Sequence, residues 1–286
     1  MTIRVGVVAN RRYAGLTEVF ERLHERAAAL KMTLAFETEL ADTIVEGERF
    51  DETARIDVLL TLGGDGTMLR GARLLGARQI PIMGVNVGRL GFLTACGIED
   101  FERALGLLAA GDYIIESRMV IEARSSKEPD HHWRALNDVV LHKGGRARVF
   151  RIHARVDGEL IGAYAADGLI VCTPTGSTAY SLSAGGPVVA PTVESMILTP
   201  ISPHTLGIRP LVLPPTAELT LHADDSPEDL MVTVDGQVGT TFVAGDTLTV
   251  RRADRPTLMI RFRDGSFFAR MRRKLGWGGL RERDEE

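Results

Sequence analysis

The chain has 286 residues, a formal net charge of −4, and 44% hydrophobic and 25% charged residues, a composition typical of a globular protein with one large or two ordinary domains. The mildly negative charge excludes a global attraction to nucleic acid or anionic lipid, so a phosphate-bearing ligand must be held by local groups. Cys96 and Cys172 fit neither a disulfide framework nor a zinc site. There is no signal-peptide pattern and no apolar window of membrane-spanning length, so we expect a soluble, cytoplasmic protein.

Apolar strand-like runs alternate with helical patterns through the first third of the chain. We expect strands at 3–10, 33–37, 56–62 and 80–86, with helices at 17–30 and 67–75. Continuous apolar strands separated by helices are typical of a parallel sheet covered on both faces, so this region predicts an open α/β domain. Ligands of such sheets bind beyond the carboxyl ends of the strands, which is where segments 63–67 and 84–91 lie.

The pattern changes after a predicted helix at 99–111. Short β-rich runs follow from Tyr113 onward, and Asp-Gly pairs at 157–158, 167–168 and 235–236 predict turns between strands. We therefore expect an α/β domain over residues 1–112 and a mostly antiparallel β domain over 113–264. For residues 265–286 we expect a basic amphipathic helix that packs on the body of the protein, followed by a charged tail.

The stretch GGDGT at 63–67 directly follows an apolar strand. Glycines at 63, 64 and 66 let the backbone adopt conformations closed to other residues and approach a phosphate closely, while Thr67 can cap the next helix. Asp65 would then bind a bridging metal ion or accept a proton from an attacking hydroxyl. The alternative is a plain strand-to-helix turn with an exposed aspartate.

A second cluster, at 167–189, combines seven hydroxyl side chains with four glycines after an apolar strand. Small hydroxyls suit a polyhydroxylated ligand such as a nucleoside, and Tyr180 offers a ring for stacking on a base. A hydroxyl-rich loop with ordinary turn bonding is the alternative. Asn137 and Asp138 form a third feature, which either reads a base edge and a sugar hydroxyl or makes a turn or cap.

In this order, the three features resemble the NAD kinase family, whose members phosphorylate the adenosine 2′-hydroxyl of NAD to give NADP. The family's GGDGT motif falls on 63–67, its Asn-Glu/Asp motif on Asn137 and Asp138, and its signature TPTGSTAYSLSAGGP on 173–187 without a gap. Segments 86–94, 202–206 and 208–214 are also similar to family segments. The resemblance runs from Val5 to Trp277.

The resemblance implies an open parallel-sheet α/β domain, a β-sandwich-like C-terminal domain, and a last helix that returns to the first domain. It also implies an active site in the cleft between the domains, and a homodimer or homotetramer. It implies Asp65 as the catalytic acid/base, and Gly63, Gly64, Gly66 and Thr67 as the loop for the phosphate donor. It places Arg148 at a position that often reaches the ligand from a neighbouring subunit. The implied NAD contacts are Asp65, Gly66, Asn137, Asp138, Arg148, Ala165, Asp167, Thr178, Ala179, Tyr180, Ser181, Leu182, Ser183 and Gln237.

The implied reaction uses NAD and ATP or another nucleoside triphosphate, with inorganic polyphosphate left open as a donor and Mg²⁺ bound with the donor. No metal ligand is assigned beyond Asp65 as a candidate. Many family members have glutamate in place of Asp138, and some bacterial members have arginine in place of Ala165, so preference between NAD and NADH stays open. A lipid kinase that shares GGDGT and a non-catalytic NAD-binding sensor are the alternatives. Neither a nucleic-acid nor a membrane partner is expected.

Overall fold

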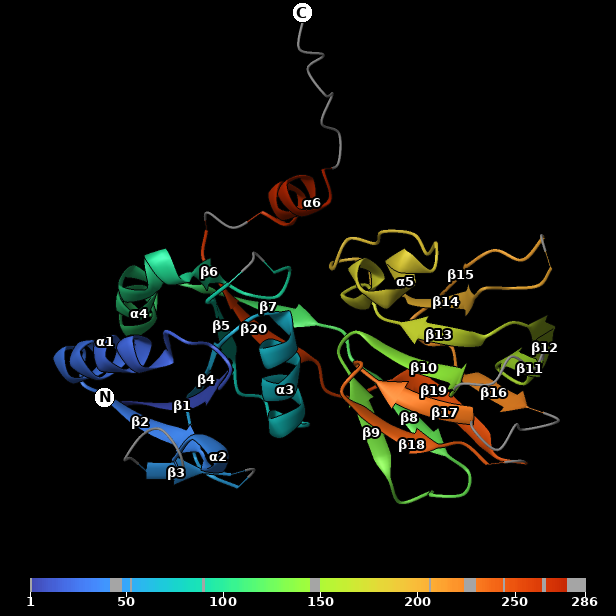
Figure 1. Ribbon diagram of the computed structural model, residues 1–286, viewed down its shortest axis with the longest axis horizontal. Coiled ribbons are helices and arrows are strands. Elements are labelled where there is room, and N and C mark those ends of the chain that lie inside the picture. Colours follow the sequence, from blue (N-terminus) through green and yellow to red (C-terminus); the bar gives the residue numbers. More distant parts are fainter. Residues whose placement is uncertain are drawn as a thin grey trace, which may run out of the picture. The chain divides into compact units, whose positions relative to one another are not determined.

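The computed structural model describes residues 2–41, 48–51, 53–88, 91–144, 150–205, 207–223, 230–243, 245–263 and 266–276. The chain forms two compact units (Figure 1). Unit 1 comprises residues 1–117 and 258–286, and unit 2 comprises residues 118–257.

Unit 1 is built on an eight-stranded sheet with the order β3-β2-β1-β4-β5-β20-β7, to which β6 adds beside β5. The pairs β1/β2, β1/β4, β2/β3, β4/β5, β5/β6 and β5/β20 are all parallel. The strands are β1 (Ile3–Ala9), β2 (Met32–Glu37), β3 (Glu48–Phe50), β4 (Val58–Leu62), β5 (Ile82–Asn86), β6 (Cys96–Gly97), β7 (Ile114–Arg118) and β20 (Thr257–Arg261).

Helices cover both faces of this sheet (Figure 1). Side chains of a strand alternate between faces, and in β4 Val58, Leu60 and Leu62 join one core cluster with residues of α1 (Leu16–Ala29) and α4 (Phe101–Ala110). The intervening Thr61 faces α3 (Asp65–Leu75), because its hydroxyl lies 3.4 Å from the sulfur of Met68. All five residues of β4 are therefore buried, as expected for a parallel sheet.

Two strands that follow residue 112 belong to the sheet of unit 1. β7 forms its edge, and β20 lies between β5 and β7 although it comes after the whole of unit 2 in the chain. Helix α6 (Phe267–Leu275) follows β20, with Ser266 as its N-cap and Gly276 in the left-handed conformation at its C-terminus. The structure also contains the short helices α2 (Thr38–Ala41) and η1 (Ile98–Asp100).

Unit 2 contains two six-stranded sheets in which every described pair is antiparallel. One has the order β15-β14-β13-β10-β17-β18 and the other β12-β11-β16-β19-β8-β9, and one hydrophobic cluster draws residues from both. The expected fold class, a parallel α/β part and an antiparallel β part, is therefore confirmed.

The first sheet of unit 2 has β10 (Asp138–Lys143), β13 (Gly168–Cys172), β14 (Met196–Ile201), β15 (Leu211–Leu213), β17 (Leu230–Val234) and β18 (Val238–Thr241). The second has β8 (Ile121–Ser125), β9 (His132–Ala135), β11 (Arg151–Val156), β12 (Glu159–Ala165), β16 (Leu219–Ala223) and β19 (Thr247–Arg252). The short helices η2 (Gly176–Thr178) and α5 (Tyr180–Ser183) follow β13.

Two of the three predicted Asp-Gly turns are hairpin turns. In the pairs 157–158 and 235–236 both residues have positive φ, as in a type I′ turn. The first pair is the whole two-residue loop between Val156 and Glu159, whereas the second is part of a three-residue loop between Val234 and Val238. The predicted turn at 167–168 is wrong, because Gly168 is the first residue of β13 and pairs with His142. Glycine is required there for space, since a Cβ would lie 2.5 Å from the carbonyl oxygen of Leu141.

No helix among the described residues combines the length and apolar character that crossing a membrane requires.

Candidate active site

The GGDGT stretch makes the turn from β4 into α3. Gly64 is the N-cap residue with φ −96° and ψ −165°, and Asp65 is the first helical residue. None of the glycines at 63, 64 and 66 adopts a positive φ, so the expectation of a conformation closed to other residues is wrong. Gly63 is needed for space, because a Cβ there would lie 2.1 Å from Oγ1 of Thr67.

Thr67 does not cap α3, contrary to the sequence expectation. It is a buried residue of the first helical turn, and Gly64, which has no side chain, occupies the N-cap position. The helix N-terminus therefore keeps its positive dipole end without a neutral hydroxyl cap. The carboxylate of Asp65 is the negative group in this first turn.

The Asp65 carboxylate is held by the backbone of residues 91–93. Phe92 N–H donates to Oδ2 and Leu93 N–H donates to Oδ1, each at 2.9 Å. Gly91 permits this approach, since a Cβ on it would lie 2.0 Å from Oδ1. The carboxylate keeps lone pairs for a further donor, so it is oriented and still able to accept a proton.

Two arginines hold the other side of the same loop. Arg261 is 4% exposed, donates from Nη1 to the carbonyl oxygens of Leu93 (2.7 Å) and Thr94 (2.9 Å), and pairs through Nε with Glu116 (2.9 Å). Arg270 of α6 donates to the carbonyl oxygen of Phe92 at 3.2 Å. The loop therefore presents its amides to Asp65 and its carbonyls to arginine.

Helix α6 also reaches Asp65 directly. Nζ of Lys274 lies 3.4 Å from Oδ2 of Asp65 and 4.7 Å from the centroid of the Phe92 ring. From the sequence, this helix was predicted to pack its apolar side chains on the body of the protein. Phe268 does not do so, because it is 57% exposed. The spacing of basic residues in the last turn of α6 was the signal that could have identified Lys274.

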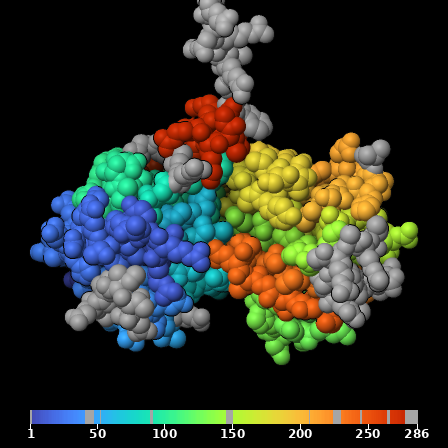
Figure 2. All heavy atoms as spheres, in the orientation of Figure 1, coloured from blue at the N-terminus to red at the C-terminus, as the bar shows by residue number. Residues whose placement is uncertain are grey.

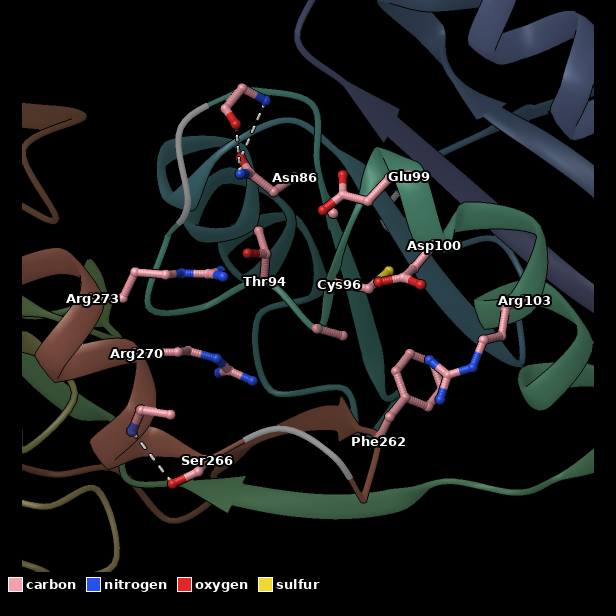
Figure 3. A pocket seen from close by; sticks show the side chains of 14 residues that line it. Asn86, Thr94, Cys96, Glu99, Asp100, Arg103, Phe262, Ser266, Arg270 and Arg273 are labelled. Atoms are coloured by element: carbon pink, nitrogen blue, oxygen red, sulfur yellow. Dashed lines mark hydrogen bonds between the residues drawn. The ribbon is translucent and has the colours of Figure 1, made fainter.

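A cavity of about 450 Å³ lies beside this loop, at the carboxyl ends of β5 and β6 (Figure 3). Its walls come from the segments 86–88, 94–97 and 99–103, from Phe262 after β20 and from the first turns of α6. Polar and charged side chains dominate the lining, which includes Asn86, Thr94, Glu99, Asp100, Arg103, Ser266, Arg270 and Arg273.

In unit 2, Asn137 and Asp138 stand at the start of β10, where the Asp235 carboxylate fixes the backbone. Its Oδ1 accepts from the N–H groups of Asn137 (2.7 Å) and Asp138 (3.1 Å), and its Oδ2 accepts from Leu136 N–H (3.1 Å). Among the described residues, the side-chain amide of Asn137 makes no hydrogen bond. This half-buried amide is available to a ligand.

Asp138 is 4% exposed and its carboxylate accepts no hydrogen bond within the described part of the chain. Burial, together with the negative charge of Asp235, raises the pKa of Asp138 to about 7. The group therefore changes charge close to neutral pH. From the sequence, Asp235 was predicted only as a turn residue, and its negative charge beside Asp138 was not expected.

The loop after β13 packs directly on the Asn137 corner. Thr173 N–H donates to the carbonyl oxygen of Asn137 at 2.9 Å, and the Thr173 hydroxyl donates to the carbonyl oxygen of Leu136 at 2.5 Å. Gly176 approaches so closely that a Cβ would lie 2.1 Å from the Asn137 carbonyl oxygen. The signature and the Asn-Asp motif therefore form one structural element.

Most hydroxyls of the signature bind protein atoms. Ser177 Oγ donates to the carbonyl oxygen of Pro174 (2.7 Å) and accepts from Val189 N–H (3.0 Å), while Ser181 Oγ bonds Oγ1 of Thr199 (2.8 Å). Both serines are fully buried. Of these bonds, the one from Ser177 to Pro174 is turn bonding, whereas the bonds to Val189 and Thr199 join the loop to distant segments.

The exposed part of the signature is the short α5 region. Tyr180 is 47% exposed, and Ser183 is exposed beside it. Thr178, Ala179 and Leu182 are half-buried. The exposed ring of Tyr180 is accessible to a base, and stacking on it stays a prediction.

The structure does not bring all predicted NAD contacts together. Asp138 pairs with Cys172 and His142 pairs with Gly168, so Asn137 lies at one end of β10 while Asp167 lies at the other. Asp167 stands opposite Lys143, which is six residues from Asn137 along the strand, a separation of roughly 20 Å. Ala165 belongs to the Asp167 end, where Asp167 forms an ion pair with Lys143 at 2.5 Å.

Of the remaining predicted contacts, Gln237 lies on the β17–β18 turn, next to Asp235 and thus at the Asn137 end. Gly66 is in the first turn of α3, adjacent to Asp65. Arg148 lies outside the described residues.

A protein-bound metal cluster is not evident in the described part of the chain, where no three His, Cys, Asp or Glu side chains gather to share an ion.

Two family models match the chain. "ATP-NAD kinase N-terminal domain" covers residues 5–113 and "ATP-NAD kinase C-terminal domain" covers residues 136–262. The NAD kinase of Gemmatimonas aurantiaca is 58% identical over 99% of both chains. The NAD kinase of Heliobacterium modesticaldum is 44% identical over 96% of this chain and 99% of its own.

Solved structures give the same assignment of fold. The crystal structure of yeast NADH kinase complexed with NADH matches with a TM-score of 0.89 and 24% identity, over 97% of this chain and 89% of its own. The crystal structure of an NAD kinase from Archaeoglobus fulgidus in complex with ATP matches with a TM-score of 0.75 and 29% identity, over 96% and 98% of the two chains.

Proposed function

This chain belongs to the NAD kinase family, and from this premise we propose that it transfers the terminal phosphate of ATP to the adenosine 2′-hydroxyl of NAD, giving NADP and ADP. The observation that carries the proposal is the 58% identity to a curated NAD kinase along the whole chain. The geometry adds an oriented carboxylate at Asp65 and an unpartnered amide at Asn137.

In the proposed reaction, the 2′-oxygen of NAD forms a bond to the γ-phosphorus while the bond from that phosphorus to the β,γ-bridging oxygen breaks. The hydroxyl proton passes to Asp65, and the negative charge leaves on ADP. Mg²⁺ belongs to the nucleotide substrate and lowers the repulsion between its phosphates. The backbone amides of Phe92 and Leu93 keep the carboxylate in place before the substrate binds.

For NAD recognition we propose the Asn137 end of the first sheet in unit 2. Its side-chain amide would bind an edge of the adenine, Asp138 would accept from a ribose hydroxyl, and Tyr180 would stack on a ring. Asp167 and Ala165, at the opposite end of β10, would not reach the same part of the ligand within one subunit. Gly63, Gly64, Gly66 and Thr67 remain the proposed backbone loop for the phosphate donor.

A coupled assay tests the proposal. Purified protein is incubated with NAD, ATP and magnesium, and NADP is detected with an NADP-dependent dehydrogenase. Formation of NADP is the expected result. No NADP, with NAD binding retained, would favour a non-catalytic sensor, and phosphorylation of a lipid supplied in place of NAD would favour a lipid kinase.

The role of Asp65 is tested by Asp65→Asn. Positioned base catalysis contributes about 10²–10⁴-fold, so kcat should fall by that range while the affinity for NAD changes little. Because an amide cannot accept from both Phe92 and Leu93 in the same way, a thermal melt of the variant serves as the control for folding. A turnover close to that of the wild type would remove the base role.

A further inference from the structure

The cationic face of α6 is the feature that the family assignment leaves unexplained. Arg273 and Lys274 follow Arg270 at three and four residues, a spacing that places both on the same face of the helix as Arg270. The helix lies on the molecular surface (Figure 2), and Arg270 and Arg273 extend from it into the cavity of unit 1 (Figure 3). Cations are favoured at any helix C-terminus, so these basic residues alone do not indicate a ligand. The lining of the cavity does.

The cavity has the chemistry of a site for a charged, chain-like ligand. Its volume of about 450 Å³ is in the range of small-molecule sites, but such sites are mostly apolar. Here three guanidinium groups, Arg103, Arg270 and Arg273, line the space, and Phe262 is the single aromatic residue of the lining. A planar base or a nicotinamide ring would find little apolar surface, whereas phosphate groups would find several cationic donors.

Arg273 is the free cation of this set. Within the described residues its guanidinium makes no hydrogen bond or ion pair, whereas Arg270 already donates to Phe92. The N–H donors of this guanidinium at the cavity therefore have no acceptor among the described residues. A phosphate oxygen is the acceptor that matches this fork geometry best.

The residues that line the cavity adjoin, in the sequence, the residues that hold the Asp65 carboxylate. Thr94 lines the cavity, and the two residues before it donate the amide hydrogen bonds to the Asp65 carboxylate. On the cationic face, Lys274 contacts Asp65, whereas Arg270 and Arg273 line the cavity. A phosphate chain lying along α6 would therefore present one terminus to Asp65.

Two carboxylates, Glu99 and Asp100, also line the cavity. They would repel a bare phosphate chain, but they would attract the cation of a magnesium-bound chain. The wall charges thus match a magnesium polyphosphate better than a free anion.

We propose that the cationic face of α6 binds the phosphate chain of the magnesium-bound donor in this cavity, with Arg273 as its principal ligand in the cavity. The inference rests on the proposed function and adds to it the place and the chemistry of donor binding. It assigns donor recognition to the phosphate chain and not to the nucleoside.

The test compares Arg273→Gln with Arg272→Gln. Both variants remove one exposed positive charge from the same helical turn, but Arg272 does not line the cavity. Magnesium tripolyphosphate, used as the probe, is titrated into each protein by isothermal titration calorimetry. Losing a charge-assisted hydrogen bond should weaken binding about tenfold or more in Arg273→Gln, and the loss of a remote surface charge should cost less than about fivefold in Arg272→Gln.

Initial rates then separate the two sources of phosphate. The KM for ATP should rise in Arg273→Gln while the KM for NAD stays unchanged, and the opposite split would assign the cavity to the pyrophosphate of NAD and overturn the proposal. Equal weakening of tripolyphosphate binding in both variants, or none in Arg273→Gln, would also overturn it. If the wild type made no NADP, the proposed function would fail, while the titration would still decide whether the cavity binds phosphate chains.

Discussion

Asp65 depends on a neighbour that has no side chain. Gly91 lies against the carboxylate, and any Cβ would come within 2.0 Å of Oδ1. The carboxylate cannot move aside without losing the amides of Phe92 and Leu93. The position of this proposed base is therefore set by the loop as much as by Asp65 itself.

We expect Gly91→Ala to lower kcat although Asp65 is still present. A displacement of about 1 Å at a reacting group can cost about 10²-fold in rate, so a loss of that order is the expected result in the coupled assay. Gly106→Ala is the matched control, because its Cβ would meet only Arg26 at 3.6 Å and alanine is favoured in a helix. An unchanged kcat in Gly91→Ala would show that the carboxylate does not need its amide support.

Asp138 makes the stability of the protein depend on pH. Its pKa rises from 3.8 in the unfolded chain to about 7 in the folded one, so between these values the folded state holds a proton that the unfolded state has lost. The contribution of Asp138 to the free energy of unfolding is therefore greatest below pH 3.8. It falls as the pH rises from 3.8 to about 7 and stays at its lowest value above that. Between pH 5.5 and pH 8 the loss is about 2 kcal/mol.

Urea denaturation at the two pH values checks this expectation. The free energy of unfolding of the wild type should fall from pH 5.5 to pH 8 by about 2 kcal/mol more than that of Asp138→Asn, which cannot titrate at this position. All other titrating groups are common to both proteins, so the difference isolates Asp138. The same pH dependence in both proteins would contradict the raised pKa.

At the scale of elements, the loop after β13 shows what the sequence could and could not predict. Its position after a buried strand followed from the pattern of apolar residues, whereas a common site with Asn137 and Asp138 was implied only by the family resemblance. The direction of its hydroxyls did not follow, because Ser177 and Ser181 find their partners at Val189 and Thr199. Such pairing depends on the tertiary fold, and serine is equally suited to a ligand or to a backbone carbonyl.

Gly176→Ala tests whether this loop and the Asn137 corner act as one element. The new Cβ would lie 2.1 Å from a backbone carbonyl oxygen, which cannot rotate away as a side chain can. We expect a loss of about 1–3 kcal/mol in the free energy of unfolding and weaker NAD binding, measured by thermal melting and calorimetry. Gly162→Ala, with an ordinary 3.5 Å contact to Tyr164, should change neither, and a stable Gly176→Ala protein with normal NAD affinity would contradict the coupling.

At the scale of the whole molecule, the alternation of strands and helices was enough to predict the parallel sheet. It could not show that β20 inserts between β5 and β7, because the segment 257–261 has the same β pattern as the strands of unit 2 that precede it. Pairing between distant segments is specified by tertiary contacts and not by local pattern. Lys274 and Arg261, which support the Asp65 site, were missed for the same reason.

This discontinuity of unit 1 predicts how the chain responds to being divided. Residues 118–257 form a continuous segment with both β sheets and a common core, so this fragment should fold alone and melt cooperatively by circular dichroism. Residues 2–117 lack β20, whose Ile260 is fully buried in the core of unit 1, and should not fold. Joining residues 258–276 to residue 117 through a glycine-serine linker should restore a cooperative transition, because it returns the missing strand to the sheet. A cooperative, native-like melt of residues 2–117 alone would show that β20 is dispensable for the sheet, and that the support of Asp65 by Arg261 is added to a unit already formed.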